Sequence, residues 1–448
     1  MKYLSSQDPE IAHLIEAETM RQSESLTLIP SENHTSPAVL EALGTVFSDK
    51  YAEGYPGRRY YAGNQVADEL ETLVRDRAKA LFGVPYANVQ PYSGSPANLA
   101  VYLAVMNPGD TFLGLDLAHG GHLTHGYALN ATGRIWRGVP YHVKSDGTID
   151  LDEVRKLAKK EKPKVIVCGG TALPRAIPFK QFAEIADECG ALLMADVSHI
   201  AGLIAGGAHE SPVPFVHIIT TTTHKTLRGP RGAMILVTQK GLDADKDLGS
   251  KIDKAIIPGA QGGPHLNNIA GIGIALKEAS QPGFKDYAER IVRNAKSLAE
   301  ALMERGITLV SGGTDNHLIL ADLTSSGVGR GVLFNDGLER IGLIANKNTV
   351  PQEQGSPIYP SGLRLGTPAV TTRGLDVSHM KQIASWISQF SAHTKDVQVP
   401  SDKDARAAVL SQFRATFNTD PFYDSLREEV RALALRYPIP AAPNHAID

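Results

Sequence analysis

The chain has 448 residues, of which 42% are hydrophobic and 21% charged, and its formal net charge is -3. This composition excludes a wholly disordered or collagen-like protein, and the lack of a basic excess argues against nucleic acid as a partner. The sequence contains no apolar leader, no apolar run of about 18 residues and only two cysteines, so we expect a cytoplasmic protein with no disulfide framework and no membrane partner.

The N-terminal part combines a helical pattern with a segment that has no periodicity. Residues 9–24 predict an amphipathic helix, one face of which carries Ile11, Leu14 and Ile15. Residues 27–66 are rich in Pro, Gly, Tyr and Ser. A segment of this length without periodicity is usually functional or disordered, and its tyrosines favour a functional segment.

Further along, short apolar runs alternate with helical patterns. We expect strands at 165–167, 191–195, 218–223 and 233–237, and helices at 67–82, 179–188 and 265–279. Continuous apolar strands between helices are typical of a mostly parallel sheet that is covered on both faces. The sequence therefore predicts an α/β domain.

A domain boundary is expected at Gln281-Pro282-Gly283. Beyond it the patterns indicate a helix at 284–305, strand-like segments and further helices. We therefore expect three parts: an N-terminal helix or arm (1–26), a large domain that includes the aperiodic strip (27–281), and a smaller α+β C-terminal domain (282–448).

A lysine stands just beyond one of the predicted strands. In residues 220–225 (TTTTHK) four β-branched residues precede His224 and Lys225. Open α/β sheets bind ligands at the carboxyl ends of their strands, and a lysine there can form a Schiff base if burial or nearby cations lower its pKa. A solvent-exposed lysine is the alternative, since lysine is rarely buried.

An aspartate follows the strand predicted at 191–195. Asp196 could pair with the protonated pyridine nitrogen of pyridoxal 5'-phosphate (PLP), which makes the ring a better electron sink. Capping of the next element is the alternative. One crossover connection fits between Asp196 and Lys225, so neighbouring strand ends could present both side chains to one ligand.

Two other segments could bind a phosphate or a flat ring. Ser95 as an N-cap, with Pro96 at the first helical position, predicts a helix start that either binds phosphate or is simply capped. Residues 119–126 (HGGHLTHG) contain three histidines but no Cys, Asp or Glu, and their glycines break any helix that would align the rings. We expect no metal site there and favour a histidine stacked on a cofactor.

Arg364 lies between glycines in residues 361–368 (SGLRLGTP). On a strand, this arginine could hold a carboxylate through two hydrogen bonds. A surface ion pair is the alternative interpretation.

Together these segments resemble the serine hydroxymethyltransferase family of fold-type I PLP-dependent enzymes. The resemblance covers about residues 24–375, through motifs at 50–61 (KYAEGYPGRRYY), 119–126, 220–231 (TTTTHKTLRGPR), 346–348 (NKN) and 361–373. It implies transfer of the serine hydroxymethyl carbon to tetrahydrofolate, giving glycine and 5,10-methylenetetrahydrofolate. It also implies a homodimer or dimer of dimers with shared active sites.

The resemblance assigns contacts with the cofactor. Lys225 would carry PLP, Asp196 would pair with the pyridine nitrogen, and His122 would stack on the ring. The remaining cofactor contacts would be Ser93, Gly94, Ser95, Thr171, His199, Thr222 and His224, with Tyr51 and Gly263 reaching the phosphate from the neighbouring subunit.

Contacts with the substrates follow from the same resemblance. Arg364 would bind the substrate carboxylate, assisted by Ser31, and His199 would contact the substrate hydroxyl. Glu53, beside Tyr61, would transfer a proton. The folate site would comprise Glu53, Tyr60, Leu117, Gly121, Leu123 and Asn348.

Other functions stay open because one segment and three single positions differ from the family's usual residues. Thr171-Ala172-Leu173 replaces Ser-Ala-Tyr, and Pro178, Ser198 and Ile257 replace Asp, Ala and Phe. One alternative is a specialised paralogue, such as an α-methylserine hydroxymethyltransferase or a threonine aldolase or transaldolase. The other is a non-catalytic binding protein. The retained folate residues argue against the aldolases, and the Lys225–Asp196 pair argues against a non-catalytic protein.

Overall fold

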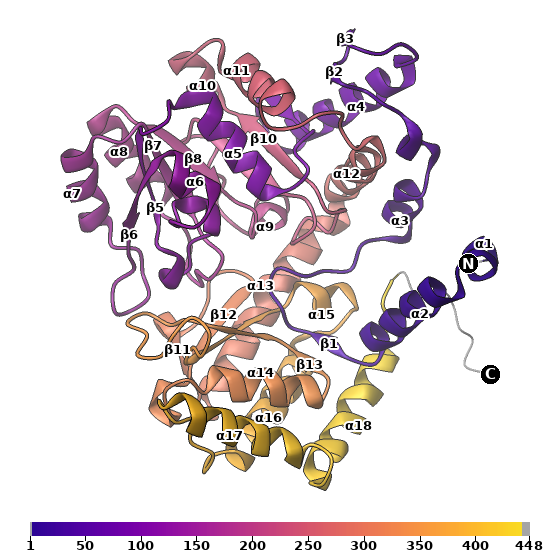
Figure 1. The fold of residues 1–448 in the computed structure, drawn as a ribbon, viewed down its shortest axis with the longest axis vertical. Helices are drawn as coiled ribbons and strands as arrows, with labels where there is room; N and C mark the ends of the chain where they lie inside the picture. The colour runs from indigo at the N-terminus through magenta and orange to yellow at the C-terminus, as the bar shows by residue number, and fades with distance from the viewer. Residues whose placement is uncertain (1, 441–448) are drawn as a thin grey trace.

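The computed structural model describes residues 2–440 as two lobes joined by a long helix, with an N-terminal arm beside them (Figure 1). One lobe contains a seven-stranded sheet and the other a four-stranded sheet. The arm consists of α1 (Lys2–Gln7) and α2 (Pro9–Ser23), which confirms the helix predicted at 9–24. Within residues 2–440, no helix is long and apolar enough to cross a membrane.

The seven-stranded sheet confirms the predicted α/β class. Its strand order is β4-β10-β9-β8-β7-β5-β6, and only β10 runs antiparallel to its neighbours. The strands are β4 (Tyr86–Asn88), β5 (Thr111–Leu115), β6 (Arg137–Tyr141), β7 (Val165–Gly169), β8 (Leu192–Asp196), β9 (Ile218–Thr222) and β10 (Ala233–Val237).

Both faces of this sheet are covered, as continuous apolar strands require. Along β7, Ile166 belongs to one hydrophobic cluster, whereas Val165 and Val167 belong to the cluster on the opposite face. The first face packs against α4 (Gln65–Phe82), α7 (Leu151–Glu161), α8 (Phe179–Cys189) and α12 (Leu266–Ala279), and the second against α5 (Gly94–Val105) and α11 (Leu248–Lys254).

The second lobe is built on an antiparallel sheet of order β11-β12-β15-β14. Its strands are β11 (Thr308–Leu309), β12 (Leu318–Asp322), β14 (Asn346–Asn348) and β15 (Gly362–Gly366), and its helices are α14 (Gly331–Arg340), α15 (Pro368–Thr372), α16 (Val377–His393), α17 (Lys403–Thr416) and α18 (Pro421–Arg436).

Two segments tie the lobes together. The long helix α13 (Pro282–Met303) places Ile291 in the core of the first lobe and Leu298 in the core of the second. Strand β1 (Leu26–Thr27) pairs in parallel with β13 (Leu343–Ile344), so the aperiodic strip begins on the second lobe. The other short elements are α3 (Pro37–Leu43), β2 (Gly54–Tyr55), β3 (Arg58–Arg59), α6 (Ala131–Ile135), α9 (Ala201–Ala205) and α10 (Gln239–Ala244).

The start of α5 differs from the prediction. The helix begins at Gly94 with Ser93 as its N-cap, so the expected cap at Ser95 was wrong by two residues. Pro96 is tolerated two positions deeper than expected, because the N–H groups of the whole first turn lack intrahelical partners.

The apolar face of α2 lies open to solvent. Ile11, Leu14 and Ile15 are 46%, 63% and 42% exposed. Isolated exposed apolar residues are common, but three on one helix face form a patch of the kind that binds another protein surface.

Candidate active site

Adjacent parallel strands bring the predicted aspartate and lysine to the same edge of the sheet. Asp196 ends β8 and lies opposite Thr220 of β9, and β9 ends two residues later at Thr222. Lys225 follows in the loop beyond β9. The carboxyl ends of parallel strands are the usual ligand-binding edge of an open α/β sheet.

Lys225 is held in a half-buried position with a single side-chain hydrogen bond. Its Nζ donates to Oγ1 of Thr222 at 3.0 Å. Burial, reinforced by Arg231 and Arg364, lowers the pKa of Lys225 to about 8, although Asp196 acts in the opposite direction. A sizeable share of the amine is therefore neutral near physiological pH, as a nucleophilic lysine requires.

Asp196 is a buried carboxylate surrounded by donors. Its Oδ2 accepts from Nδ2 of Asn98 (2.9 Å) and contacts Nε2 of His125 (3.2 Å), and its Oδ1 accepts from the hydroxyl (2.6 Å) and N–H (3.1 Å) of Ser198. Burial alone would raise the pKa of Asp196, but these bonds, with His125 and His122 close by, hold that pKa well below its usual range. The group is thus kept anionic in a site that would otherwise favour its neutral form.

The N-terminus of α5 is placed against the end of β9. A β-carbon on Gly94 would lie 2.9 Å from Cγ2 of Thr222, so only glycine allows this close approach. Within residues 2–440 the hydroxyls of Ser93 and Ser95 make no hydrogen bond, and neither side chain caps the helix. Unpaired N–H and hydroxyl groups at a helix N-terminus favour an anion.

His224 adds a hydrogen-bond donor, and its contact with Arg231 decides which ring nitrogen carries the proton. Burial and the charges of Lys225 and Arg231 lower its pKa to about 3, so the ring is neutral. Its Nε2 lies 3.2 Å from Nη1 of Arg231, and because an arginine can only donate, Nε2 accepts and Nδ1 carries the proton. That buried N–H has no acceptor among the described residues.

One histidine of the loop at 119–126 contacts Asp196. His122 is neutral, because burial lowers its pKa to about 4, and its Nδ1 accepts from the N–H of Thr124 at 3.2 Å. His125 is turned towards Asp196. In the part of the chain that the structure describes, no three His, Cys, Asp or Glu side chains are grouped to hold a metal ion.

Arg364 reaches from β15 into the same region. Its Nε donates to Oδ1 of Asn346 (3.0 Å) and its Nη1 to the carbonyl of Thr171 (2.6 Å). Within residues 2–440, Nη2 makes no hydrogen bond. Burial lowers the pKa of Arg364 to about 10, which still leaves it charged at neutral pH. A buried guanidinium with free N–H groups can receive a carboxylate.

His199 completes this cluster. Burial, then Lys225, His317 and Arg364, lower its pKa well below the usual range, so it is neutral and close to those groups. Its Nδ1 lies 3.2 Å from Nε2 of His317. Thr171 was also expected at the cofactor, and its hydroxyl donates to the carbonyl of Gly121 at 3.1 Å.

The tyrosine-rich strip forms a second, separate cluster. Rings of Tyr51 and Tyr61 lie 5.3 Å apart, and those of Tyr60 and Tyr61 lie 5.2 Å apart. A β-carbon on Gly263 would lie 3.7 Å from Cγ of Glu53 and from Cδ1 of Tyr51. The Glu53 carboxylate raises the pKa of Tyr61. Among residues 2–440, no hydrogen bond or ion pair joins Glu53 or these tyrosines to Lys225, whose Nζ bonds to Thr222.

An ion pair with Arg58 or Arg59, which are near in the sequence, is the alternative role for the Glu53 carboxylate. Arg59 pairs with Asp68 (2.8 Å) and with the buried Glu71 (2.7 Å), while its Nη1 donates to the carbonyl of Gly54. No ion pair joins Glu53 to Arg58 or Arg59 in residues 2–440. Arg59 therefore anchors the strip and leaves Glu53 free to act elsewhere.

The expected folate residues range from exposed to buried. Tyr60, Leu117 and Leu123 are 82%, 37% and 45% exposed. Gly121 is buried, since a β-carbon there would lie 1.9 Å from the carbonyl oxygen of Leu115. Asn348 is next to Thr349, whose hydroxyl donates to the carbonyl of Ala118 at 2.8 Å. These contacts bring β14 against the loop at 117–123.

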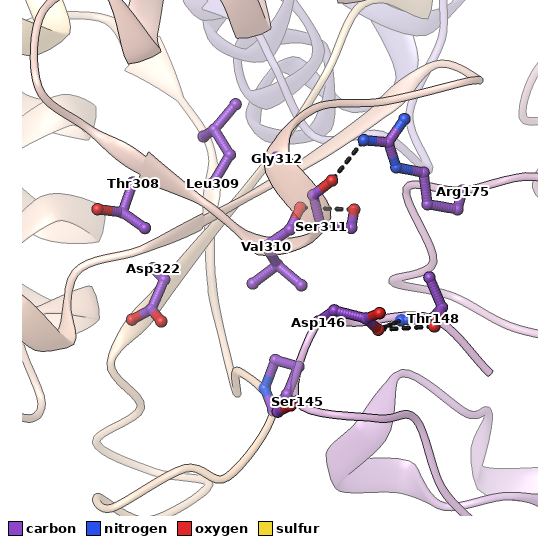
Figure 2. A pocket seen from close by; sticks show the side chains of 11 residues that line it. Ser145, Asp146, Thr148, Arg175, Thr308, Leu309, Val310, Ser311, Gly312 and Asp322 are labelled. Carbon is purple, nitrogen blue, oxygen red and sulfur yellow. Dashed lines mark hydrogen bonds between the residues drawn. The ribbon is translucent and has the colours of Figure 1, made fainter. Parts of the chain in front are cut away.

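A surface cavity of about 510 Å³ lies elsewhere, between the turn at 145–148 and the segment at 308–312 (Figure 2). Its polar groups bond to one another: Arg175 donates to the carbonyl of Ser311 and Asp146 accepts from Thr148. Because it contains none of the residues of the Lys225 or Glu53 clusters, we do not place the chemistry there.

Several residues at the site were not predicted. Asn98 and His125 bind Asp196, His317 contacts His199, and Asn33 donates to the carbonyl of Lys225 at 2.9 Å. His125 lies in the histidine motif at 119–126, and Asn33 lies in the aperiodic strip at 27–66, so the sequence pattern had marked both segments. Nothing in the local pattern marks Asn98 or His317, because their partners are distant in the sequence. Ser31, which was predicted, is half-buried beside Pro30, which packs on Gly366 at the end of β15.

Comparison with known proteins identifies this arrangement. The family model described as serine hydroxymethyltransferase matches residues 4–387. The chain belongs to the serine hydroxymethyltransferase family. The serine hydroxymethyltransferase of Acidothermus cellulolyticus is 54% identical over 98% of this chain and 97% of its own. Those of Koribacter versatilis (53%; 95% of this chain and 96% of its own) and Acidobacterium capsulatum (49%; 96% and 98%) are similar along their length.

Serine hydroxymethyltransferases use PLP and act on tetrahydrofolate as a co-substrate, and the site's own donors fit PLP. The unpaired Nδ1–H of His224 and the free groups at the start of α5 suit a phosphate. Asp196 is held anionic, which suits a protonated pyridine nitrogen, and Lys225 has the lowered pKa needed to bond an aldehyde.

Proposed function

We propose that this chain is a PLP-dependent glycine hydroxymethyltransferase that reversibly transfers the hydroxymethyl carbon of serine to tetrahydrofolate. The observation that carries the proposal is the pairing of a half-buried lysine of lowered pKa with a buried anionic aspartate on neighbouring strand ends. Residues 27–281 would form the PLP-binding domain and residues 282–448 the smaller domain that supplies Arg364.

Each cofactor-binding residue has a defined task in this proposal. When bound, PLP supplies an aldehyde for the amine of the substrate and an electron-withdrawing ring that assists Cα–Cβ cleavage. Lys225 would hold the cofactor, and Asp196 would keep the ring nitrogen protonated. The phosphate would be held by Ser93, Gly94, Ser95, Thr222 and His224, while His122, Thr171 and His199 would contact the ring.

The substrate would be oriented by charge. Arg364, with Nη2 free among the described residues, would bind the serine carboxylate with help from Ser31. His199 is neutral and buried, so it would contact the substrate hydroxyl without adding a charge. With the carboxylate and the hydroxyl held in this way, the hydroxymethyl carbon would face the folate.

The proton-transferring group would come from a second copy of the chain. Glu53, Tyr51, Tyr61 and Gly263 lie together, and no hydrogen bond or ion pair among residues 2–440 joins them to Lys225, so each cluster would form one half of a shared site. The apolar face of α2 is open for such an association. We therefore propose a homodimer, or a dimer of dimers, in which the strip of one copy completes the folate-side half of its neighbour's site, with Tyr60, Leu117, Gly121, Leu123 and Asn348.

Two free cysteines support a reducing compartment, the cytoplasm. Cys168 is fully buried and its pKa is raised by burial, so neither disulfide formation nor ready oxidation is expected of it.

The second candidate function is that of a specialised enzyme with a narrower range of substrates. Leu173 is buried and lies against Gly170, so an aliphatic side chain replaces the family's usual aromatic near Thr171. This change favours testing α-methylserine beside serine.

Product analysis tests the proposed function. Purified chain loaded with PLP is incubated with serine, with and without tetrahydrofolate, and glycine and 5,10-methylenetetrahydrofolate are quantified. We expect equal amounts of both products, and a fall in glycine formation when folate is omitted. Turnover of α-methylserine alone would assign the specialised paralogue, and threonine cleavage without folate dependence would assign an aldolase.

A further inference from the structure

The main chain at Lys225 forms a tight turn that is costly to maintain. The carbonyl of Lys225 accepts from the N–H of Arg228 at 3.0 Å. Arg228 has φ +61°, in the left-handed region that residues other than glycine rarely adopt. Such a conformation persists only where the surroundings hold it in place.

A second donor reaches the same carbonyl from far away in the sequence. Nδ2 of Asn33 donates to the carbonyl of Lys225 (2.9 Å) and also to Oη of Tyr287 (2.8 Å). Oδ1 of Asn33 accepts from the hydroxyl of Thr372 (2.7 Å) and from the N–H of His34 (2.9 Å). All four hydrogen-bonding positions of this amide are therefore occupied.

Asn33, Tyr287 and Thr372 close a ring of hydrogen bonds whose direction follows from its members. The only hydroxyl proton of Thr372 goes to Asn33, so in the 2.9 Å contact between Tyr287 and Thr372 the tyrosine must donate. Asn33 then donates to Tyr287, Tyr287 to Thr372, and Thr372 to Asn33. In such a ring each bond polarises the next, and the ring is lost as a unit when one bond is removed.

The ring joins three parts of the molecule. Asn33 comes from the N-terminal strip, Tyr287 from α13 and Thr372 from α15 of the second lobe. Tyr287 is only 7% exposed, and the guanidinium of Arg228 lies 4.9 Å from the centre of its ring. The aromatic ring thus packs against the strained residue itself.

We propose that Asn33, Tyr287 and Thr372 form a clamp that positions the main chain of Lys225, so that its Nζ is directed towards the cofactor site. This inference rests on the proposed role of Lys225 and assigns these three side chains as positioning residues. None of them needs to touch PLP or substrate.

The test uses the chain freed of PLP and two variants that each open the ring, Tyr287→Phe and Thr372→Val. The matched control is Tyr141→Phe, which removes another buried tyrosine hydroxyl bond, from Oη to the carbonyl of Val167. Two quantities are measured: hydrogen–deuterium exchange of the peptide that covers 225–229, and the rate at which added PLP becomes reducibly bound at Lys225.

Opening the ring should speed exchange in this peptide and slow PLP attachment by about two- to tenfold, the effect of one net hydrogen bond. The double variant should be no slower than either single variant, because one missing bond already opens the ring. The control should leave both quantities unchanged. Variants that match the control in either quantity would overturn the clamp. A wild-type chain that attaches no PLP at Lys225 would instead refute the proposed function. In that case, hydrogen–deuterium exchange of the peptide that covers 225–229 would still test the clamp.

Discussion

Replacing Lys225 with alanine should yield a folded protein that no longer attaches PLP covalently and has lost at least roughly 10³-fold of its turnover, as for other essential nucleophiles. The reason is that the amine close to Asp196 has been removed. Borohydride reduction followed by peptide mapping measures the attachment. Lys225 makes one side-chain hydrogen bond, to Thr222, so the melting temperature should fall by no more than about 2–4 °C.

Lys240→Ala is the matched control for this variant. Lys240 donates to Asp187 on the surface, and surface ion pairs contribute little to stability. This control should retain the covalent cofactor and its activity. A borohydride-stable bond that persists at another lysine in Lys225→Ala would show that Lys225 had been misassigned.

Replacing Glu53 with glutamine should lower folate-dependent turnover by roughly 10²–10⁴-fold, the loss typical of a removed acid–base group. Glutamine keeps the size and hydrogen bonding of Glu53 but cannot transfer a proton. Serine should still bind and shift the absorbance of the bound cofactor. Cleavage of a substrate that needs no folate, such as allo-threonine, should suffer much less.

The structure sharpens this prediction, because Glu53 forms no ion pair among residues 2–440 and Arg59 pairs with Asp68 and Glu71 instead. The melting temperature of Glu53→Gln should therefore match that of wild type. Glu69→Gln, an exposed carboxylate on α4, is the control and should change neither rate nor stability. Unchanged folate-dependent turnover in Glu53→Gln would exclude Glu53 as the proton-transferring group.

The local sequence pattern predicted those helices and strands in which the preferences of the residues agree with their packing in the folded chain. Strand β10 occupies the predicted residues 233–237, because a run of five buried apolar residues has no alternative arrangement. The start of α5 was misplaced because the Ser95-Pro96 pair is a strong local signal, whereas Gly94 is required by its close approach to Thr222. That contact joins distant segments and leaves no trace in the nearby sequence.

The residues of the candidate site also divide into those that the local sequence predicted and those that it did not. Lys225 and Asp196 could be paired from the sequence because each ends an apolar run of recognisable length. Asn98 and His317 could not, since their hydrogen bonds depend on how α5 and β12 pack against the sheet edge.

The most direct test of the central claim, that Lys225 of one copy works with Glu53 of another, is a subunit-mixing experiment. Lys225→Ala and Glu53→Gln chains, each nearly inactive alone, are unfolded together, refolded with PLP and assayed for transfer of the serine hydroxymethyl carbon to tetrahydrofolate. Each mixed dimer contains one site with both residues intact, so random pairing should restore about a quarter of the activity of wild-type chain treated in the same way. Mixtures as inactive as the separate variants, with mixed dimers shown to be present, would contradict the account.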